Sequence, residues 1–176
     1  MKLDKSFKYF LYALALVVIG ILLHMQVNNW NESRKAALQE YVIYNETFPE
    51  SQTEIKEVIN GIVRDAQTAN LEGLTSLHLQ SDKFTKFGPR RFERQDVNQT
   101  NESESAHFGS VENFKMEVKD LKIDVFGNMG IATYYPHVSS EKGGKQNAGS
   151  ARQTLVFLKT SDGWKIVHEH GTMRPE

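Results

Sequence analysis

An arginine and two histidines lie close together near the C-terminal end of the chain, in two segments that alternate between apolar and polar residues. Arg152 opens the segment 152–160, and His168 and His170 lie in the segment 163–172. An arginine can hold a carboxylate or a carbonyl through parallel hydrogen bonds, and a histidine can donate or accept a proton near neutral pH. The three residues are therefore candidates for binding a small anionic or carbonyl-bearing ligand.

The tripeptide Ser161-Asp162-Gly163 predicts a tight turn that joins the two segments into a β-hairpin. Side chains two residues apart on a strand share a face, so Arg152 shares one with Thr154, and His168 and His170 share one with Trp164. If the two faces coincide, the polar groups stand on an apolar wall, as a ligand pocket requires. The predicted ligand-binding residues are Arg152, Thr154, Trp164, His168, His170 and, from the preceding strand, Tyr134.

Other interpretations of these residues remain open. One histidine can be a hydrogen-bonded wall residue while the other satisfies a backbone group or an acid, and Arg152 can pair with Glu169 or Asp162 at the rim. Two histidines at i and i+2 can also aim at one metal ion, but they need further ligands. The available residues have no diagnostic spacing, so we expect neither a metal nor another cofactor: His78, Asp82, Glu93 and His137.

Leu155, Phe157 and Val167 are assigned to the opposite face of the predicted hairpin. A strand pair that is apolar on both faces needs cover on both. The pattern therefore predicts a homodimer formed sheet to sheet.

The whole chain has 176 residues, with 21 basic and 22 acidic side chains and a formal net charge of −1. Composition therefore implies no basic face, and a nucleic-acid partner is not expected. There is no cysteine, which excludes disulfides and thiolate chemistry. Once an apparent membrane segment is set aside, the length suits one domain of ordinary size.

Residues 9–27 are almost continuously apolar, and no Asp, Glu, Lys or Arg occurs from Tyr9 to Asn31. About 19 residues at about 1.5 Å each span about 28 Å, close to the thickness of the hydrocarbon core. Lysines dominate residues 1–8, so the positive-inside rule predicts a cytoplasmic N-terminus and a periplasmic or extracellular C-terminal domain. No small-x-small cleavage site follows, which favours a retained anchor over a cleaved signal peptide.

After the anchor, residues 28–49 predict a juxtamembrane helix or linker that Pro49 ends, and residues 50–176 predict the domain. Ser51 and Glu54 form a candidate capping box for a helix that runs to about residue 69. Asn70 is a candidate cap of a second short helix, and KFTKFG is a possible strand. The polar stretch 88–109 is interpreted as a loop with a weak helix.

From Phe114 onward the apolar residues recur with a period of two, which predicts strands. The period changes parity at Lys119-Asp120, and such a change predicts a β-bulge and a bent strand. Gly127-Asn128 and Gly143-Gly144 predict further turns. Helices followed by a meander of bent strands indicate an α+β domain with its helices on one face of the sheet.

Two stretches resemble known families. The pattern Arg-x-Thr, alternating apolar residues and then GWKIVHEHGT is similar to the last hairpin of SnoaL-like domains, in the nuclear transport factor 2-like (ketosteroid isomerase-like) superfamily. The resemblance covers about residues 50–174 and implies a cone in which N-terminal helices pack on a strongly bent, mostly antiparallel sheet around a pocket, commonly as a dimer. LYALALVVIGILLHMQVNNWNESRK is similar to the N-terminal anchor of a group of bacterial membrane proteins.

Enzymes of the ketosteroid isomerase or polyketide cyclase kind, which the domain resembles, need a carboxylate base in an apolar pocket. Asp65, Asp82 and Glu93 are the candidates, and none lies in a recognisable motif. The predicted function is therefore non-catalytic binding of a small molecule by a membrane-anchored domain. One alternative is a lyase or isomerase, such as a dehydratase, acting on a small carbonyl or hydroxylated compound, with His168 or His170 as base. Another is a structural dimerisation module.

Overall fold

The computed structural model describes residues 4–89 and 91–174, and the chain divides into two units, Met1–Glu46 and Thr47–Glu176. The outermost residues of the predicted cytoplasmic segment, 1–3, and of the predicted domain, 175 and 176, lie outside the described parts. The first unit is helix α1, Lys5–Asn45, which is long and apolar enough to be a candidate membrane span. It includes both the predicted anchor and most of the predicted juxtamembrane segment.

The second unit contains helices α2 (Pro49–Gln67), α3 (Leu71–Leu77) and α4 (Val97–Phe108). Helix α2 begins at Pro49, whose missing N–H is not needed in a first helical turn. The predicted capping box at Ser51 is therefore wrong, because the helix starts two residues earlier. The predicted cap of α3 is confirmed, since the side chain of Asn70 accepts a hydrogen bond from the Gly73 N–H at 3.1 Å.

Helix α4 replaces most of the expected loop. Asp96 accepts a hydrogen bond from the Gln99 N–H at 2.9 Å, and Gln99 accepts one from the Asp96 N–H at 3.1 Å. This reciprocal capping box satisfies two N–H groups that would otherwise lack partners at the helix start. The polar composition of the segment obscured a well-capped helix.

The sheet has the order β1-β5-β4-β3-β2 within the described residues, and every adjacent pair is antiparallel except β1 and β5. Its long strands follow one another as hairpins, at the turns that the glycines predicted. The strands are β1 (Thr85–Phe87), β2 (Glu112–Phe126), β3 (Met129–Lys142), β4 (Lys145–Thr160) and β5 (Gly163–Met173). The predicted α+β class is confirmed.

The pairing of the described strands shifts register at three places. One shift lies between Glu112 and Lys115 near the start of β2, and the other two are bulges within the long strands. The first bulge lies at Asp120, where the pairing of β2 with β3 shifts and φ is +51°, as the change of parity predicted. The second lies at Val167 on β5, because Val156 pairs with His168 whereas Phe157 pairs with Ile166. The extra residue reverses the side-chain alternation of β5. The alternating sequence did not reveal this second bulge.

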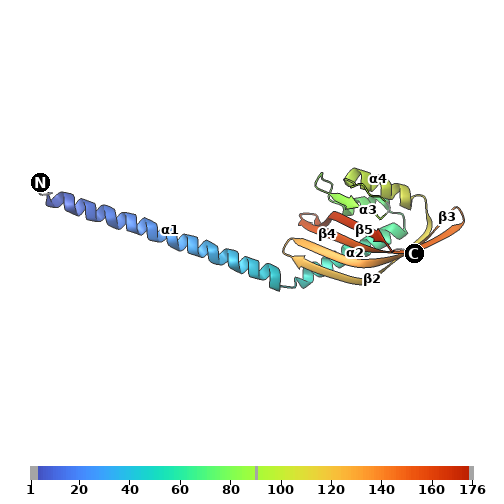
Figure 1. Cartoon of the computed structure of the whole chain (residues 1–176), viewed down its shortest axis with the longest axis horizontal. Coiled ribbons are helices and arrows are strands. Elements are labelled where there is room, and N and C mark those ends of the chain that lie inside the picture. The colour runs from blue at the N-terminus through green and yellow to red at the C-terminus, as the bar shows by residue number, and fades with distance from the viewer. Residues whose placement is uncertain (1–3, 90, 175–176) are drawn as a thin grey trace. The chain divides into compact units, whose positions relative to one another are not determined.

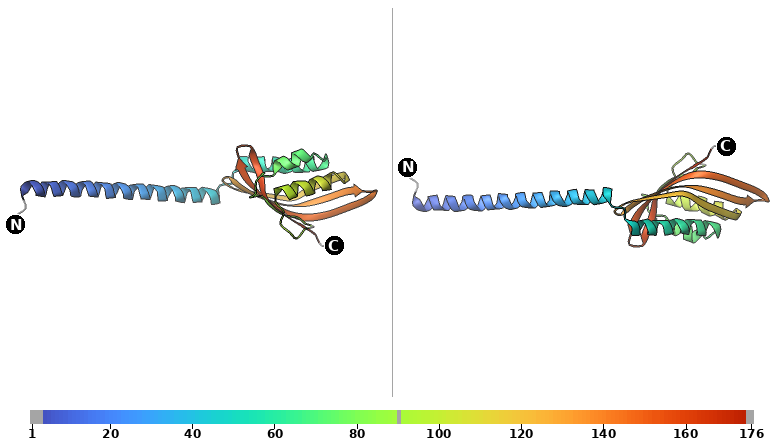
Figure 2. Two further views of the ribbon diagram at one scale, coloured as in Figure 1. Left: turned by 90° about the horizontal axis from the view of Figure 1, so that it is seen from above. Right: turned by 90° about the horizontal axis from the view of Figure 1, so that it is seen from below.

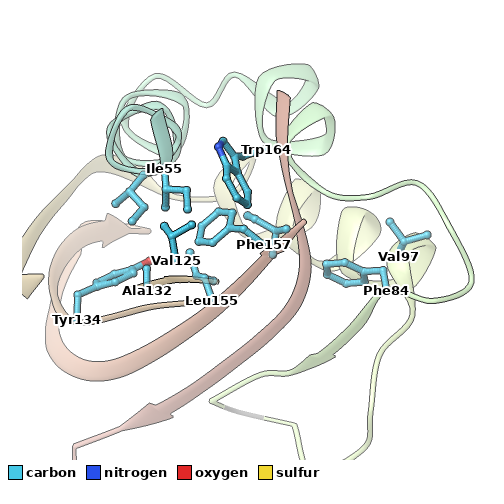
Figure 3. Close-up of a cluster of buried hydrophobic side chains, with 11 residues drawn as sticks. Ile55, Phe84, Val97, Val125, Ala132, Tyr134, Leu155, Phe157 and Trp164 are labelled. Atoms are coloured by element: carbon cyan, nitrogen blue, oxygen red, sulfur yellow. The ribbon is translucent and has the colours of Figure 1, made fainter. Parts of the chain in front are cut away.

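The helices α2, α3 and α4 lie on one face of the curved sheet, which we call the inner face (Figures 1 and 2). The core forms between them, with Ile55 of α2 and Phe157 of β4 fully buried in it (Figure 3). Leu155 belongs to the same cluster. Leu155 and Phe157 are therefore covered by the domain's own helices, so the argument that they need a second subunit for cover is wrong.

Candidate functional site

A cavity of about 380 Å³ lies between the inner face and the helices. Its size is that of a site for a small molecule. Most of the lining is apolar, and its side chains come from α2, α3, α4 and the sheet. Representative apolar lining residues are Ile62, Leu74, Phe108, Met116, Leu155 and Ile166.

Four ionisable side chains form one wall of this cavity, and we call them the buried quartet: His78, Lys86, Glu104 and Glu169. Glu169 Oε1 lies 2.8 Å from His78 Nε2, and Glu169 Oε2 lies 2.8 Å from Lys86 Nζ. Lys86 also donates to Glu104. Glu104 Oε2 lies 3.9 Å from His78 Nε2. The quartet is thus a closed cycle of opposite charges.

Backbone geometry brings the quartet together from four places in the chain. Lys86 is the central residue of β1 and is the register partner of Glu169 on β5. The bulge at Val167 turns Glu169 to the inner face, where it is 6% exposed. His78 caps the C-terminal end of α3, and Glu104 lies on α4.

The hydrogen-bond network fixes the protonation state of His78. Gln80 Nε2 donates to the carbonyls of Thr75 and His78, so Gln80 Oε1 is the atom that accepts from Asn101 Nδ2. Asn101 Oδ1 then faces His78 Nδ1 at 3.0 Å, and His78 Nδ1 must donate. His78 Nε2 donates to the Glu169 carboxylate, so both ring nitrogens carry protons and His78 is an imidazolium.

The surrounding charges support this assignment. Burial alone lowers the pKa of His78, but the hydrogen bond and charge of Glu169, with the charge of Glu104, outweigh it and raise the pKa above 6.5. For Glu169, burial favours the neutral acid, but Lys86 and His78 hold the pKa well below its usual value of 4.5. Burial disfavours the charged form of Lys86, yet the two carboxylates raise its pKa. Two cations therefore neutralise two carboxylates.

His78, Glu104 and Glu169 also have the donor composition of a metal site, and one ligand atom from each lies within 4.8 Å of the others. The ammonium group of Lys86, however, contacts both carboxylates. A metal ion would have to displace this lysine, so the residues present fit an ion-pair cluster better than a metal centre.

Tyr134, one of the six predicted ligand contacts, lines the cavity from β3 and is 4% exposed. Burial, together with the nearby charges of Glu169 and Glu104, raises the pKa of its hydroxyl above the usual value of 10.0. The phenol is therefore neutral and remains a hydrogen-bond donor.

Four of the predicted residues lie on the opposite, outer face of the sheet. Arg152, Thr154 and His170 line a groove there, as their common face predicted. His168 lies on the same face, where its Nδ1 is 2.7 Å from Thr85 Oγ1. The expectation that the two histidines share a face with Trp164 is wrong, because the bulge at Val167 puts them on opposite faces of the sheet.

Trp164 is a core residue and does not line the cavity. It is 4% exposed, and its indole N–H donates to Glu54 Oε2 at 2.7 Å. The expected pair of Arg152 with Glu169 also does not form, because Glu169 is buried on the other face of the sheet. No ion pair joins Arg152 to an acid within residues 4–89 and 91–174.

The sequence reasoning did not identify the quartet as a unit. The spacing Asp96-x-x-Gln99 was the available signal for α4, and it would have placed Glu104 on a helix. The parallel pairing of β1 with β5 joins residues about 80 positions apart, and no local pattern predicts such a pair. The inward direction of the Glu169 side chain could not be predicted, because it depends on the bulge at Val167 and no glycine marks that bulge in the sequence.

Comparison with known proteins places this geometry among related folds. The model of the SnoaL-like domain family matches residues 55–174. The comparison with curated proteins finds no match.

Solved structures share the fold at low sequence identity. A proposed dehydratase of the nuclear transport factor 2-like family from Streptomyces avermitilis is 17% identical, with a TM-score of 0.67 over 73% of this chain and 99% of that one. A nuclear transport factor 2-like protein from Salmonella enterica is 21% identical, with a TM-score of 0.66 over 73% and 94%. A proposed aromatic ring hydroxylase from Novosphingobium aromaticivorans is 11% identical, with a TM-score of 0.64 over 72% and 91%.

Proposed function

Because the chain belongs to the SnoaL-like domain family, whose fold encloses a cavity, we propose that its domain binds a small, mostly apolar molecule there without transforming it. The observation that carries the proposal is the cavity of about 380 Å³ with an apolar lining and one polar wall. The buried quartet supports a non-catalytic role, because its hydrogen bonds and charges are already satisfied within the protein.

A thermal-shift experiment on the full chain in lipid nanodiscs tests this function, because a ligand that binds the folded domain alone raises its melting temperature. The probes are 2-acetylnaphthalene and the similarly shaped hydrocarbon 2-isopropylnaphthalene. At least one is expected to stabilise the protein. Val138→Trp, which fills the cavity from the inner face, abolishes the shift, whereas His137→Trp on the outer face retains it. A shift for neither probe, or an equal shift in both variants, contradicts the proposal.

A second candidate is an isomerase or lyase, favoured by one observation: His78 Nε2 and Glu169 Oε1 lie 2.8 Å apart at the cavity wall. Such a pair can move a proton, although here both ring nitrogens of His78 are already engaged. Hydrogen exchange at the methyl group of 2-acetylnaphthalene in D₂O separates the two functions. Exchange that is faster with the wild type than with His78→Gln supports the enzyme, and equal rates support binding alone.

The long apolar helix α1 supports a membrane-anchored location for the binding domain. Lys2, Lys5 and Lys8 precede the apolar stretch 9–27, and by the positive-inside rule they favour a cytoplasmic N-terminus and a domain in the periplasm or outside the cell. We assign the protein to ligand binding or sensing at the cell envelope on this basis.

The outer face of the sheet supports a homodimer, for a different reason from the one that the sequence offered. Ile131, Tyr135 and Phe87 present apolar surface there and are 37%, 50% and 39% exposed. Arg152, Thr154 and His170 lie on the same face and are assigned to this interface. Of the predicted ligand contacts, Tyr134 is assigned to the ligand.

A further inference from the structure

Two polar side chains of the cavity lie outside the buried quartet. Tyr134 on β3 and Gln153 on β4 are register partners, and both line the cavity. Gln153 is in turn opposite Gly171 on β5, where a Cβ atom would come within 2.6 Å of Gln153 Oε1. The absence of a side chain at Gly171 therefore leaves room for the amide of Gln153. The pairing of β3 with β4 places this amide beside the phenol of Tyr134 on the inner face.

Neither side chain has a hydrogen-bond partner in the described parts of the chain. Within residues 4–89 and 91–174, Thr100 Oγ1 is the one fully enclosed side-chain polar atom without a partner. The hydroxyl of Tyr134, whose residue is 4% exposed, therefore borders open space. Tyr134 and Gln153 also border the outer groove, but the burial alternation of β3 and β4 puts both side chains on the inner face, where the open space is the cavity. Tyr134 is buried and Gln153 is partly buried. Buried polar groups are normally paired, so the Tyr134 hydroxyl calls for an external partner, and the amide of Gln153 lies beside it.

The charge of the wall limits what this partner can be. Both cations of the quartet are engaged by its carboxylates, so neither is left to compensate an anion. An anionic ligand would lose its hydration beside Glu104 and Glu169. Arg91 and His107 also line the cavity, but both are exposed, where water weakens their attraction.

We propose that Tyr134 and Gln153 recognise one uncharged oxygen group, a carbonyl or a hydroxyl, on an otherwise apolar ligand. This inference rests on the proposed function and specifies its ligand class. Tyr134 donates to the oxygen, and Gln153 donates to the same oxygen or accepts from a hydroxyl. The anionic ligand that the arginine and histidines had indicated is thereby replaced by a neutral one. A ligand without the oxygen leaves both side chains unpaired and loses the net contribution of about one hydrogen bond.

Affinities of the full chain in nanodiscs for three probes of one shape test the inference, with binding to empty nanodiscs subtracted. The probes are 2-acetylnaphthalene, 2-isopropylnaphthalene and 2-naphthoate. The ketone is expected to bind about three- to tenfold more tightly than the hydrocarbon, which corresponds to one net hydrogen bond, and the carboxylate is expected to bind least. Tyr134→Phe and Gln153→Leu each reduce the preference for the ketone, and Tyr135→Phe, its neighbour on the outer face, leaves it unchanged.

The outcomes separate this inference from the function on which it rests. If the ketone and the hydrocarbon bind equally well, or if Tyr134→Phe retains the preference, the cavity binds ligands but the recognition point is wrong. If 2-naphthoate binds most tightly, the charge argument is wrong. If no probe binds, the proposed function itself fails.

Discussion

At the scale of single residues, the members of the buried quartet depend on one another energetically. Each of its charges has lost most of its water and depends on the others for compensation. Removing one member of such a cluster leaves an uncompensated buried charge, which costs more than the intact cluster contributes. Its members therefore act on stability as a group, although they come from four separate elements.

Glu169→Gln is expected to lower the free energy of unfolding by about 3 to 5 kcal/mol, because two buried cations then share one carboxylate. Urea unfolding of the full chain in nanodiscs measures the loss. The matched control is Glu117→Gln, which removes an exposed glutamate and leaves the urea midpoint unchanged. Adding Lys86→Met to Glu169→Gln restores part of the stability, and a double variant less stable than the single one would contradict the neutral quartet.

The quartet also predicts how stability depends on pH. The pKa of His78 is raised above 6.5 in the folded protein, so the stability that its charge contributes is complete below pH 6.5 and is lost as pH rises through the raised value. Glu169 acts in the opposite direction and loses its contribution only in acid, since its pKa lies below 4.5.

Urea midpoints between about pH 6 and about pH 9 test the role of His78. The midpoint of the wild type falls across this range, and the fall is absent in His78→Gln. His137→Gln, which changes an exposed histidine on the outer face, retains it. A fall of the same size in His78→Gln would assign the pH dependence to another group.

At the scale of the elements, helix α4 holds one side of the cavity and depends on its N-terminal capping box. Asp96→Ala is expected to destabilise the domain by about 1 kcal/mol, because the N–H of Gln99 loses its partner. Asn98→Ala, an exposed change in the same helical turn, is the control and leaves the urea midpoint nearly unchanged. Equal effects of the two variants would show that the cap does not support α4.

Most elements built from local patterns were predictable, with helix α4 as the exception, whereas the pairing of distant segments was not. The bulge at Asp120 shifts the positions of the apolar residues from even to odd, so the sequence reveals it. The residues on either side of Val167 show no such clear shift, so the sequence does not reveal the bulge there. Because of this one extra residue, Glu169 lies on the inner face and the two histidines lie on the outer face, the reverse of the prediction. Tyr134 lines the cavity, and no bulge separates it from Ala132 and Pro136 on β3, so its ligand contact stays a prediction.

At the scale of the whole molecule, the absence of cysteine from the sequence makes single-cysteine labelling a direct test of topology. Asp162→Cys, in the exposed turn before β5, is expected to react with a membrane-impermeant maleimide in right-side-out spheroplasts. Asp4→Cys, before the apolar stretch, reacts only after the membrane is permeabilised. The reverse pattern would place the domain in the cytoplasm, and labelling of both sites without permeabilisation would contradict the membrane anchor.

Because the sequence has no cysteine, cross-linking through single introduced cysteines can also test the homodimer. In a two-fold symmetric interface, equivalent residues near the axis lie opposite each other, so a cysteine at the centre of the outer face can cross-link to its copy. Thr133 and Thr154 are register partners at that centre. Thr133→Cys or Thr154→Cys is expected to give a covalent dimer under mild oxidation in the membrane, and Asp162→Cys is expected to remain monomeric. Cross-linking at Asp162 alone would move the interface to the hairpin end, and no cross-linking at any of the three positions would leave the outer face to solvent.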